Sequence, residues 1–391
     1  MKKIIFLLLL FTTTTVYAAH PNSLGFRLFL STMIPLTRAH GISQSVIHHN
    51  LLTAEYLSDV INKDSNQPES VLNYNDYMKL FVTSHRINQG IQFYQQNQSV
   101  LNKISRQYHV QPGYLVAILG AETNYGKNLG TYPVISALAT LAYFDHRHVF
   151  FKKELIAALK IIQNSNFNKN KMTGSWAGAI GQCQFMPSLY LNYAVSYLGN
   201  KSPDIWNNPA DALASTANYF HQQGWQYSEN TALRVKLPVN FPLSQIGLNN
   251  HKTISEWQHL GVKTYHDESF PTWQGLTSII LLKESSDRTY LVNNNFIILL
   301  KLNASYLYAL AITQLANKIS VAINTLPKQP KIFLTAQTTV IITIQRLPDR
   351  FTVLNHRLNK IKQKVFNFTI YKTNFYQNWR HDPINPIFKN Q

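Results

Sequence analysis

Residues 112–126 read Pro-Gly-Tyr-Leu-Val-Ala-Ile-Leu-Gly-Ala-Glu-Thr-Asn-Tyr-Gly, a strongly apolar segment with one acid near its end. Pro112 is typical of the first turn of a helix, and Gly126 is typical of the position that ends one. The segment therefore predicts a helix that is buried in the core, and it favours a mainly helical fold around it.

Glu122, the acid in this segment, has no lysine or arginine closer along the chain than Lys127. Burial disfavours the anion of this carboxyl, and so does the negative end of the helix dipole, so both effects predict a raised pKa. A carboxylic acid that is still protonated near neutral pH can serve as the general acid that cleaves a glycosidic bond. The alternative is a glutamate that only ends a helix in a cap or a salt bridge.

The segments on either side are also mostly helical in pattern. Thr83-Ser84 marks a helix start inside the apolar periodicity of residues 77–94. Residues 304–319 are apolar on more than one face, which predicts a late helix that docks on the core. Further helices are predicted at about residues 133–142, 149–163, 188–198 and 209–223.

Residues 231–301 have a different texture. Short strand patterns at 277–282, 289–292 and 296–300 surround a turn of three asparagines at 293–295. The sequence therefore predicts a mainly α protein with a small α/β insertion of short antiparallel strands.

The composition is that of a folded, basic protein. The 391 residues include 36 basic and 18 acidic ones, which gives a net charge of +18, and 21 Phe, 21 Tyr and 6 Trp exclude disorder of the whole chain. The single cysteine, Cys183, excludes a disulfide framework or a thiolate zinc cluster. The positive net charge favours a polyanionic partner, and the candidates are nucleic acid, a membrane surface and the bacterial cell wall.

The N-terminal residues narrow the choice among these polyanionic partners. Lys2-Lys3 precedes an apolar run at residues 4–11, and a small-residue end follows at Ala18. This pattern predicts a secretory signal that is cleaved after Ala18, since the run is too short to span a bilayer and no cysteine follows that could carry a lipid. A buried N-terminal core helix is the alternative. Export argues against nucleic acid as the partner.

The charge is unevenly distributed along the chain. Residues 1–19 carry +2, residues 20–325 carry +7 and residues 326–391 carry +9. Residues 332–345 are β-branched and strand-prone, and no motif is recognisable in this basic C-terminal extension.

Residues 174–188 read Gly-Ser-Trp-Ala-Gly-Ala-Ile-Gly-Gln-Cys-Gln-Phe-Met-Pro-Ser. Small residues let a backbone approach a ligand closely, and the Gln184 amide can both donate and accept hydrogen bonds. Such a loop suits a sugar, which grooves hold with amides, hydroxyls and flat aromatic rings. Four aromatic residues could supply the rings, unless they belong to the core: Trp176, Tyr190, Trp206 and Trp225.

Six ordered strings of this sequence resemble the lytic murein transglycosylase B family. They are GAETNYG (120–126), ISALATLAYF (135–144), FFKKEL (150–155), GSWAGAIGQCQFMPSLYLNYA (174–194), NNPADALASTANYFHQQGW (207–225) and YLVNNNFIILLKLNASYLYALAITQLA (290–316). The resemblance covers roughly residues 70–320. It implies a lysozyme-like helical fold and cleavage of the β-1,4 bond between N-acetylmuramic acid and N-acetylglucosamine in peptidoglycan, without water, to leave a 1,6-anhydromuramoyl end.

The resemblance and the patterns above divide the chain into six parts. We expect a signal peptide at 1–18, an N-terminal helical part of the cleft at 19–108 and a lysozyme-like catalytic core at 109–230. A small α/β subdomain at 231–302, a late helix at 303–325 that packs on the core, and the basic extension at 326–391 complete the chain.

The resemblance also implies roles for single residues. Glu122 matches the lone catalytic acid of the family, and Ser175 and Gln184 match polar groups that line the cleft. The remaining matches are Asn303 and Tyr308, which approach the reacting sugar, Tyr77, an aromatic cleft residue, and Arg147, one of two arginines that meet the stem peptide, the second being replaced here by His148.

One carboxyl, rather than the two of ordinary glycosidases, fits this chemistry. In the family the N-acetyl oxygen of the substrate attacks C1 as the acid protonates the leaving oxygen, and the resulting carboxylate then takes the proton of the C6 hydroxyl. The other acids near the motif are assigned to surface or helix roles: Asp145, Glu154, Asp204 and Asp211.

No metal or cofactor is expected. The family can carry an EF-hand-like calcium loop, but its ligand positions here hold no carboxylate, on which calcium affinity depends. These positions are Ser196, Leu198, Asn200, Ser202 and Asn207. Cys183 is interpreted as a small packing residue, because no histidine in the motif could activate it.

The favoured reading is an exported, monomeric, periplasmic lytic transglycosylase without an integral membrane span, whose partners are glycan strands and stem peptides and not nucleic acid. Three alternatives stay open. A hydrolysing, lysozyme-like muramidase would direct water to the same intermediate. A non-catalytic protein would only bind peptidoglycan, and a binder of nucleic acid or membrane surfaces would depend on the basic extension alone.

Overall fold

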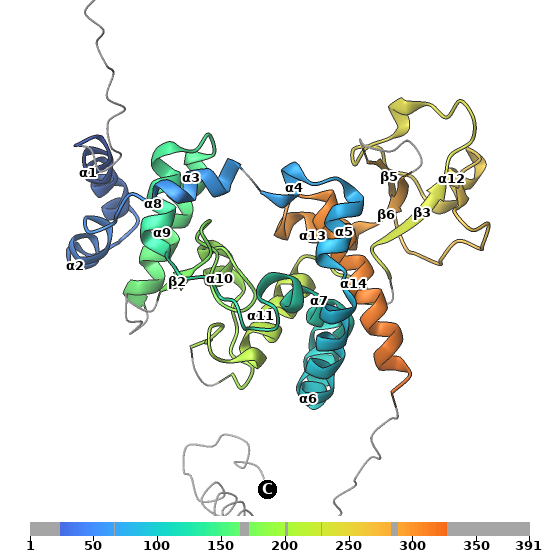
Figure 1. Cartoon of the computed structure of the whole chain (residues 1–391), viewed down its shortest axis with the longest axis horizontal. Helices are drawn as coiled ribbons and strands as arrows, with labels where there is room; N and C mark the ends of the chain where they lie inside the picture. The colour runs from blue at the N-terminus through green and yellow to red at the C-terminus, as the bar shows by residue number, and fades with distance from the viewer. Residues whose placement is uncertain are drawn as a thin grey trace, which may run out of the picture. The chain divides into compact units, whose positions relative to one another are not determined.

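The computed structural model describes residues 24–65, 67–164, 172–199, 202–227, 229–282 and 288–326. The predicted signal peptide at 1–18, the strand-prone segment at 332–345 and nearly all of the basic extension lie outside these residues. Helices dominate the described part, with short antiparallel strands, which confirms the predicted fold class (Figure 1).

The apolar segment quoted above forms helix α7 (Pro112–Thr123), which begins at Pro112 as predicted. It packs between α6 (Ser84–Tyr108) and α14 (Tyr306–Asn324), and Figure 1 shows the three side by side. The contact with α14 is so close that a methyl group at Gly113 would lie 2.0 Å from Oγ of Ser320. Asn124 ends the helix in a left-handed conformation, with φ of 50°.

The other predicted helices form, with shifted ends. Thr83 caps α6 by accepting a hydrogen bond from the Arg86 amide at 3.1 Å, and this separates α6 from α5 (Tyr74–Phe81). The helix predicted to reach residue 198 ends earlier, because Ser215 and Asn218 of the next helix bind the chain at residues 193–195. The four helices predicted from about residue 133 to residue 223 are α8 (Val134–Phe144), α9 (His148–Asn164), α10 (Pro187–Tyr193) and α11 (Pro209–Gln222).

The N-terminal part is built from shorter elements that the sequence patterns did not resolve. Phe26, Leu30 and Met33 of the first helix are buried against the main core. The elements are α1 (Leu24–Ala39), α2 (Gln44–Val46), a π-helix (Ile47–Leu51), α3 (Ser58–Ser65) and α4 (Pro68–Val71).

The α/β insertion is a four-stranded antiparallel sheet in the order β4-β3-β6-β5. A small core of its own lies beneath the sheet, around Val235, Trp257 and Leu291. Its strands are β3 (Ala232–Lys236), β4 (Lys263–Thr264), β5 (Ser278–Leu281) and β6 (Thr289–Val292), and the helix α12 (Ile254–His259) packs with them. A separate two-stranded pair joins β1 (Tyr132–Pro133) to β2 (Thr173–Gly174).

The strand predicted at 296–300 is wrong, because these residues form helix α13 (Asn294–Leu302). Asn293 caps the helix, accepting hydrogen bonds from the amides of Asn295 and Phe296. The run of asparagines that reads as a turn is thus a helix start, and the apolar residues behind it are buried by packing on the core.

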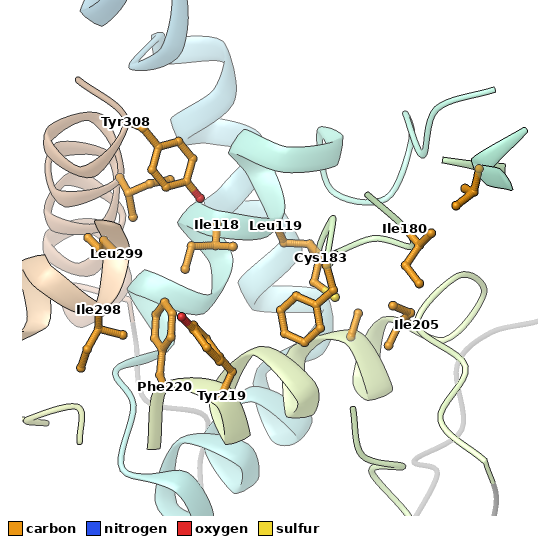
Figure 2. Close-up of a cluster of buried hydrophobic side chains, with 14 of the residues drawn as sticks. Ile118, Leu119, Ile180, Cys183, Ile205, Tyr219, Phe220, Ile298, Leu299 and Tyr308 are labelled. Atoms are coloured by element: carbon orange, nitrogen blue, oxygen red, sulfur yellow. The ribbon is translucent and has the colours of Figure 1, made fainter. Parts of the chain in front are cut away.

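The main core joins the loop at 174–186 to α7, α11 and α13 (Figure 2). Cys183 lies inside it, next to Leu119, and burial raises the pKa of its thiol to about 12. Its interpretation as a packing residue is therefore confirmed. Within the described residues no single helix has the length and apolar composition of a membrane span. The helices α13 and α14 together have that length and composition, but the pair is bent by 116°.

Candidate active site

A cavity of about 870 Å³ lies where α4, α7, α9, the loop at 174–186 and the end of α13 meet. It collects residues that are far apart in the sequence. Five of the seven predicted site residues line it: Glu122, Arg147, Ser175, Gln184 and Asn303.

Glu122 stands in the last turn of α7, at the boundary between the core and the cavity. The pKa of its carboxyl is raised to about 7: burial is the largest cause, a hydrogen bond from Tyr308 opposes the increase, and the nearby charge of Glu69 adds to it. The predicted rise in pKa, with burial as its main cause, is thus present. The acid is poised to lose and regain a proton near neutral pH.

The Tyr308 hydroxyl donates to Oε1 of Glu122 at 2.5 Å. Tyr308 is buried in the first turn of α14, and Figure 2 shows its ring reaching from that helix toward α7. Its own pKa lies well above the usual value, because of burial first and of the Glu122 charge second, so the phenol stays a neutral donor. The acid proton of Glu122 is then carried by Oε2.

Tyr77 does not line the cavity, although it was predicted as a cleft residue. Its side chain is fully buried and stacks on Phe81 with ring centroids 4.3 Å apart. The hydroxyl donates to Oε1 of Glu69 at 2.9 Å. Tyr77 therefore contacts the cavity only through Glu69.

Glu69 is the residue that the sequence patterns missed. It lies in the four-residue helix α4 and lines the same cavity as Glu122. The sequence predicts a single carboxyl at the site, but the cavity holds two, because Glu69 reaches it from more than fifty positions upstream of Glu122. Its distance from the motif in sequence hides it, and no local pattern marks it, because Tyr77 lies eight residues later in a separate helix.

The loop at 174–186 is fixed to the end of α7. The Thr123 hydroxyl donates to the carbonyl of Gln182 at 2.8 Å and accepts from the Gly126 amide at 3.0 Å. Ser175 Oγ accepts from the Ala179 amide at 3.1 Å, which closes the loop on itself. Because Thr123 directly follows Glu122 in the chain, these bonds fix the position of the loop relative to Glu122.

Gln184 has a left-handed backbone, with φ of 48°, which is unusual for a residue with a side chain. Its amide nitrogen donates to the carbonyls of Gly181 at 2.9 Å and Leu129 at 3.2 Å. These bonds orient the side chain in the cavity wall. Such strain is common at ligand-binding sites.

Asn303 ends α13, and its five-residue spacing to Tyr308 spans the sharp bend into α14. Ser305 caps α14 and accepts from the Tyr308 amide at 3.2 Å. The bend gives the two predicted residues different positions. Asn303 lines the cavity, whereas Tyr308 does not line it and donates a hydrogen bond to Glu122.

Arg147 lines the cavity but is already engaged by carboxylates. It forms hydrogen bonds to both oxygens of Asp145 at 3.1 and 3.2 Å, pairs with Asp64, and stacks over Phe151. An anionic group of a ligand in the cavity would therefore meet a guanidinium whose position is already fixed by Asp145 and Asp64.

Asp145, Glu154 and Asp211, which were assigned to surface or helix roles, are buried, so a surface role is wrong for these three. Glu154 lies in α9 and Asp211 in the first turn of α11, as a helix role requires. Glu154 accepts from the amide and hydroxyl of Ser188, at 2.9 and 2.7 Å. Asp211 accepts from the amides of Tyr197 and Asp204, at 2.8 and 2.9 Å. Each carboxylate replaces water at a backbone donor, which lets it be buried.

Of the four aromatic residues proposed for the groove, Trp176 lines the cavity. Trp206 and Trp225 are buried in the core, and Tyr190 packs on Trp206 while donating to the Pro203 carbonyl. The alternative that they are core residues holds for these three.

The described residues contain no group of three or more histidine, cysteine or acidic side chains placed to hold a metal ion. Asn200, one of the calcium-loop positions, lies outside the described residues. The expectation that no calcium binds stays a prediction.

Comparison with known proteins gives consistent matches. Residues 25–317 match the family described as Transglycosylase SLT domain. Membrane-bound lytic murein transglycosylase B of Escherichia coli strain K12 is 28% identical over 329 residues, which covers 78% of this chain and 84% of that protein.

Two solved structures are also similar. SltB3 from Pseudomonas aeruginosa, in complex with NAG-anhNAM-pentapeptide, has a TM-score of 0.69 and 35% identity, covering 76% of this chain and 80% of that chain. The Escherichia coli lytic transglycosylase Slt35, in complex with calcium, has a TM-score of 0.64 and 28% identity, covering 78% and 95%.

Proposed function

We infer that this chain, which belongs to the transglycosylase SLT domain family and is a lytic transglycosylase of peptidoglycan, uses Glu122 first as an acid and then as a base. The bond cleaved is the β-1,4 link between N-acetylmuramic acid and N-acetylglucosamine. The products are a free N-acetylglucosamine hydroxyl and a 1,6-anhydromuramoyl end.

The proposed reaction has two steps that consume no water. Glu122 gives its proton to the glycosidic oxygen while the N-acetyl oxygen of the muramoyl residue attacks C1, which breaks the C1–O4 bond. The Glu122 carboxylate then removes the C6 hydroxyl proton, O6 attacks C1, and the C1 bond to the N-acetyl oxygen breaks. The enzyme ends in its starting protonation state.

The observation that carries this proposal is the Glu122 carboxyl with its pKa raised to about 7 at the wall of a cavity that can hold a sugar. A pKa near the working pH serves both a proton donor and a proton acceptor. The Tyr308 hydrogen bond strengthens when Glu122 becomes negative, so it stabilises the intermediate state of the acid.

The remaining wall suits the substrate. We assign Ser175 and Asn303 to the acetamido group and the ring near C1, and Gln184 to hydroxyls of the glycan. Arg147 would meet a carboxylate of the stem peptide. The solved relative SltB3 is bound to NAG-anhNAM-pentapeptide, which supports a cleft that takes both sugar and peptide.

Peptidoglycan lies in the bacterial envelope, so the predicted leader at residues 1–18 fits an enzyme that works in the periplasm. The relatives act on the same polymer, as their names state. The monomeric state stays a prediction.

Hydrolysis is the second candidate, and Glu69 is the observation that favours it. Glycosidases that use water need two carboxyls across the scissile bond, and Glu69 lines the same cavity as Glu122. In that case Glu69 would activate water, and the products would have reducing ends.

Digestion of purified murein sacculi tests the proposal. Mass spectrometry of the muropeptides should show anhydro ends that are one water lighter than the products of a lysozyme. Glu122→Gln should lower the rate by about a thousandfold. Reducing ends would establish hydrolysis instead, and an active Glu122→Gln variant would remove Glu122 from the mechanism.

A further inference from the structure

Two carboxyls of the cavity are each held by a buried phenol. Tyr308 of α14 donates to Glu122 of α7, and Tyr77 of α5 donates to Glu69 of α4. Both tyrosines are nearly or fully buried. The two acids therefore face one cavity from two different pairs of helices, and each accepts a hydrogen bond from a buried tyrosine.

We propose that Glu69 is a positioning residue of this reaction: its carboxylate, held by Tyr77, keeps a negative charge beside Glu122 and thereby keeps that acid protonated. The inference rests on the proposed function of Glu122. A like charge at short range disfavours ionisation of its neighbour, and screening is weak where water is partly excluded.

The fixation of Glu69 is what makes this effect dependable. A flexible surface glutamate would swing away from a second anion. Here the Oε1 atom is held at 2.9 Å from the Tyr77 hydroxyl, and the Tyr77 ring cannot move because it is enclosed and stacked on Phe81. Burial and then the charges of Glu69 and Glu122 raise the pKa of the Tyr77 phenol, and the cation of Arg86 opposes them, so the Tyr77–Glu69 pair lies within the electrostatic reach of Glu122.

The cations that line the cavity have partners of their own. Arg147 binds Asp145 and Asp64, Lys301 donates to the Gln223 side chain at 3.0 Å, and Lys63 lies over the Tyr132 ring. The groups that face Glu122 from the packed elements are Tyr308 of α14, Glu69 of α4, Tyr77 of α5 behind Glu69, and the Cys183 thiol of the loop. All of these are neutral or negative.

The same charge assists the second step. After Glu122 has given up its proton, two carboxylates face one cavity, and the repulsion between them makes Glu122 a stronger base. That favours removal of the C6 hydroxyl proton. Glu69 itself exchanges no proton in this scheme.

Glu69→Gln tests the proposal with little change of shape, because the Gln oxygen can still accept from Tyr77. We expect the Glu122 carboxyl to titrate at a pH lower by about half to one unit. Carbon-13 NMR of labelled glutamate carboxyls measures this directly, with Glu122→Gln to assign the signal. Glu268→Gln, which removes a charge from an exposed loop of the α/β insertion, is the matched control and should leave the titration unchanged.

The pH dependence of the rate is the second measurement. The Glu122 proton is needed, so activity falls as pH rises through its pKa, and this fall should come at lower pH in Glu69→Gln. At pH 7 the rate should drop roughly two- to fivefold, and the loss should shrink toward the acidic plateau, where Glu122 is protonated in both proteins. Glu69→Asp, which keeps the charge, should restore most of the original profile.

The outcomes separate the two proposals. An unchanged Glu122 titration in Glu69→Gln would overturn the role of Glu69, even if Glu122 is the catalytic acid. A rate loss that is equal at every pH would do the same, since it would indicate a structural role or a water-activating base. Full activity of Glu122→Gln would instead contradict the proposed function, whatever the titration shows. Thermal unfolding of each variant confirms that it is folded.

Discussion

Glu122 at the end of α7 and Asp145 at the turn between α8 and α9 are both poorly accessible carboxyls, and Arg147, the partner of Asp145, lines the same cavity as Glu122. The pKa values of the two acids nevertheless move in opposite directions. Burial raises the pKa of Glu122 to about 7, and a single phenol opposes it. Burial acts on Asp145 as well, but hydrogen bonds from the Arg147 side chain, from Asp64 and from the Arg147 backbone hold its pKa well below the usual range.

The difference shows that hydrogen-bonding partners can override the effect of burial on the pKa of a carboxyl. A guanidinium that forms two hydrogen bonds fixes Asp145 as an anion and makes it a structural group. A neutral tyrosine on one side and an anion on the other leave Glu122 able to exchange its proton. The same carboxyl chemistry thus gives a structural ion pair at Asp145 and, at Glu122, an acid whose raised pKa suits its proposed catalytic role.

The largest expected effect concerns the pH dependence of stability. Glu122 has a pKa of about 7 when folded, against 4.5 for an ordinary glutamate. Below pH 4.5 both states hold the proton and the carboxyl contributes nothing. As pH rises to 7 the unfolded chain ionises first, so the folded state loses up to about 3 kcal/mol.

Urea unfolding of the protein and of Glu122→Gln at several pH values measures this loss. The stability of Glu122→Gln relative to the unaltered protein should increase between pH 4.5 and 7 and then stay constant. All other groups titrate in both proteins, so the difference isolates Glu122. A difference that is flat across this range would mean that Glu122 is not destabilised as an anion.

Arg147→Ala tests the other half of the comparison. It would leave the Asp145 side chain, which is 2% exposed, without its cation. Breaking a fully buried pair costs about 3 to 5 kcal/mol, and since Arg147 is 41% exposed we expect about 2 kcal/mol. The loss should shrink as pH falls, because the released carboxyl then binds a proton.

Chemical denaturation at pH 7 and at pH 4 gives both quantities. Adding Asp145→Asn to Arg147→Ala should recover part of the stability, since the more buried of the two carboxyls that lose Arg147 is then neutral. If the double variant is as unstable as the single one, the contribution of Arg147 comes from its packing on Phe151 and not from the ion pair.

These two sites also show what a sequence can predict. The helix of residues 112–123, its buried acid and the raised pKa follow from local patterns, because apolar composition and one unpaired glutamate in a short stretch determine them. Of the seven site residues that the family resemblance implied, five line the cavity.

What could not be predicted depends on long-range packing. Glu69 reaches the cavity from a four-residue helix that has no periodic pattern, and Tyr77 contributes through a bond to Glu69 rather than by meeting a ligand. The helix at 294–302 was mistaken for a strand because its apolar residues give no period in so short a run, and the deciding cap is a single asparagine.

The smallest of the three effects should come from Tyr308→Phe, which removes one hydroxyl and keeps the ring. Without the donor, the anion of Glu122 loses its hydrogen bond, so its pKa should rise above about 7, opposite to the change in Glu69→Gln. The fall of activity at high pH should move upward accordingly. The maximal rate should decrease about tenfold, because the bond is strongest when Glu122 has given up its proton.

Rate profiles over pH on sacculi, with carbon-13 titration of Glu122, measure both changes. Tyr190→Phe is the matched control, since it also removes a hydroxyl that donates to a protein oxygen, at the Pro203 carbonyl, from a residue outside the cavity. A tenfold loss with an unshifted titration would place Tyr308 on the sugar instead of on the acid. Shifts of the same sign in Tyr308→Phe and Glu69→Gln would contradict the balance of one donor and one anion on which the contrast between Glu122 and Asp145 depends.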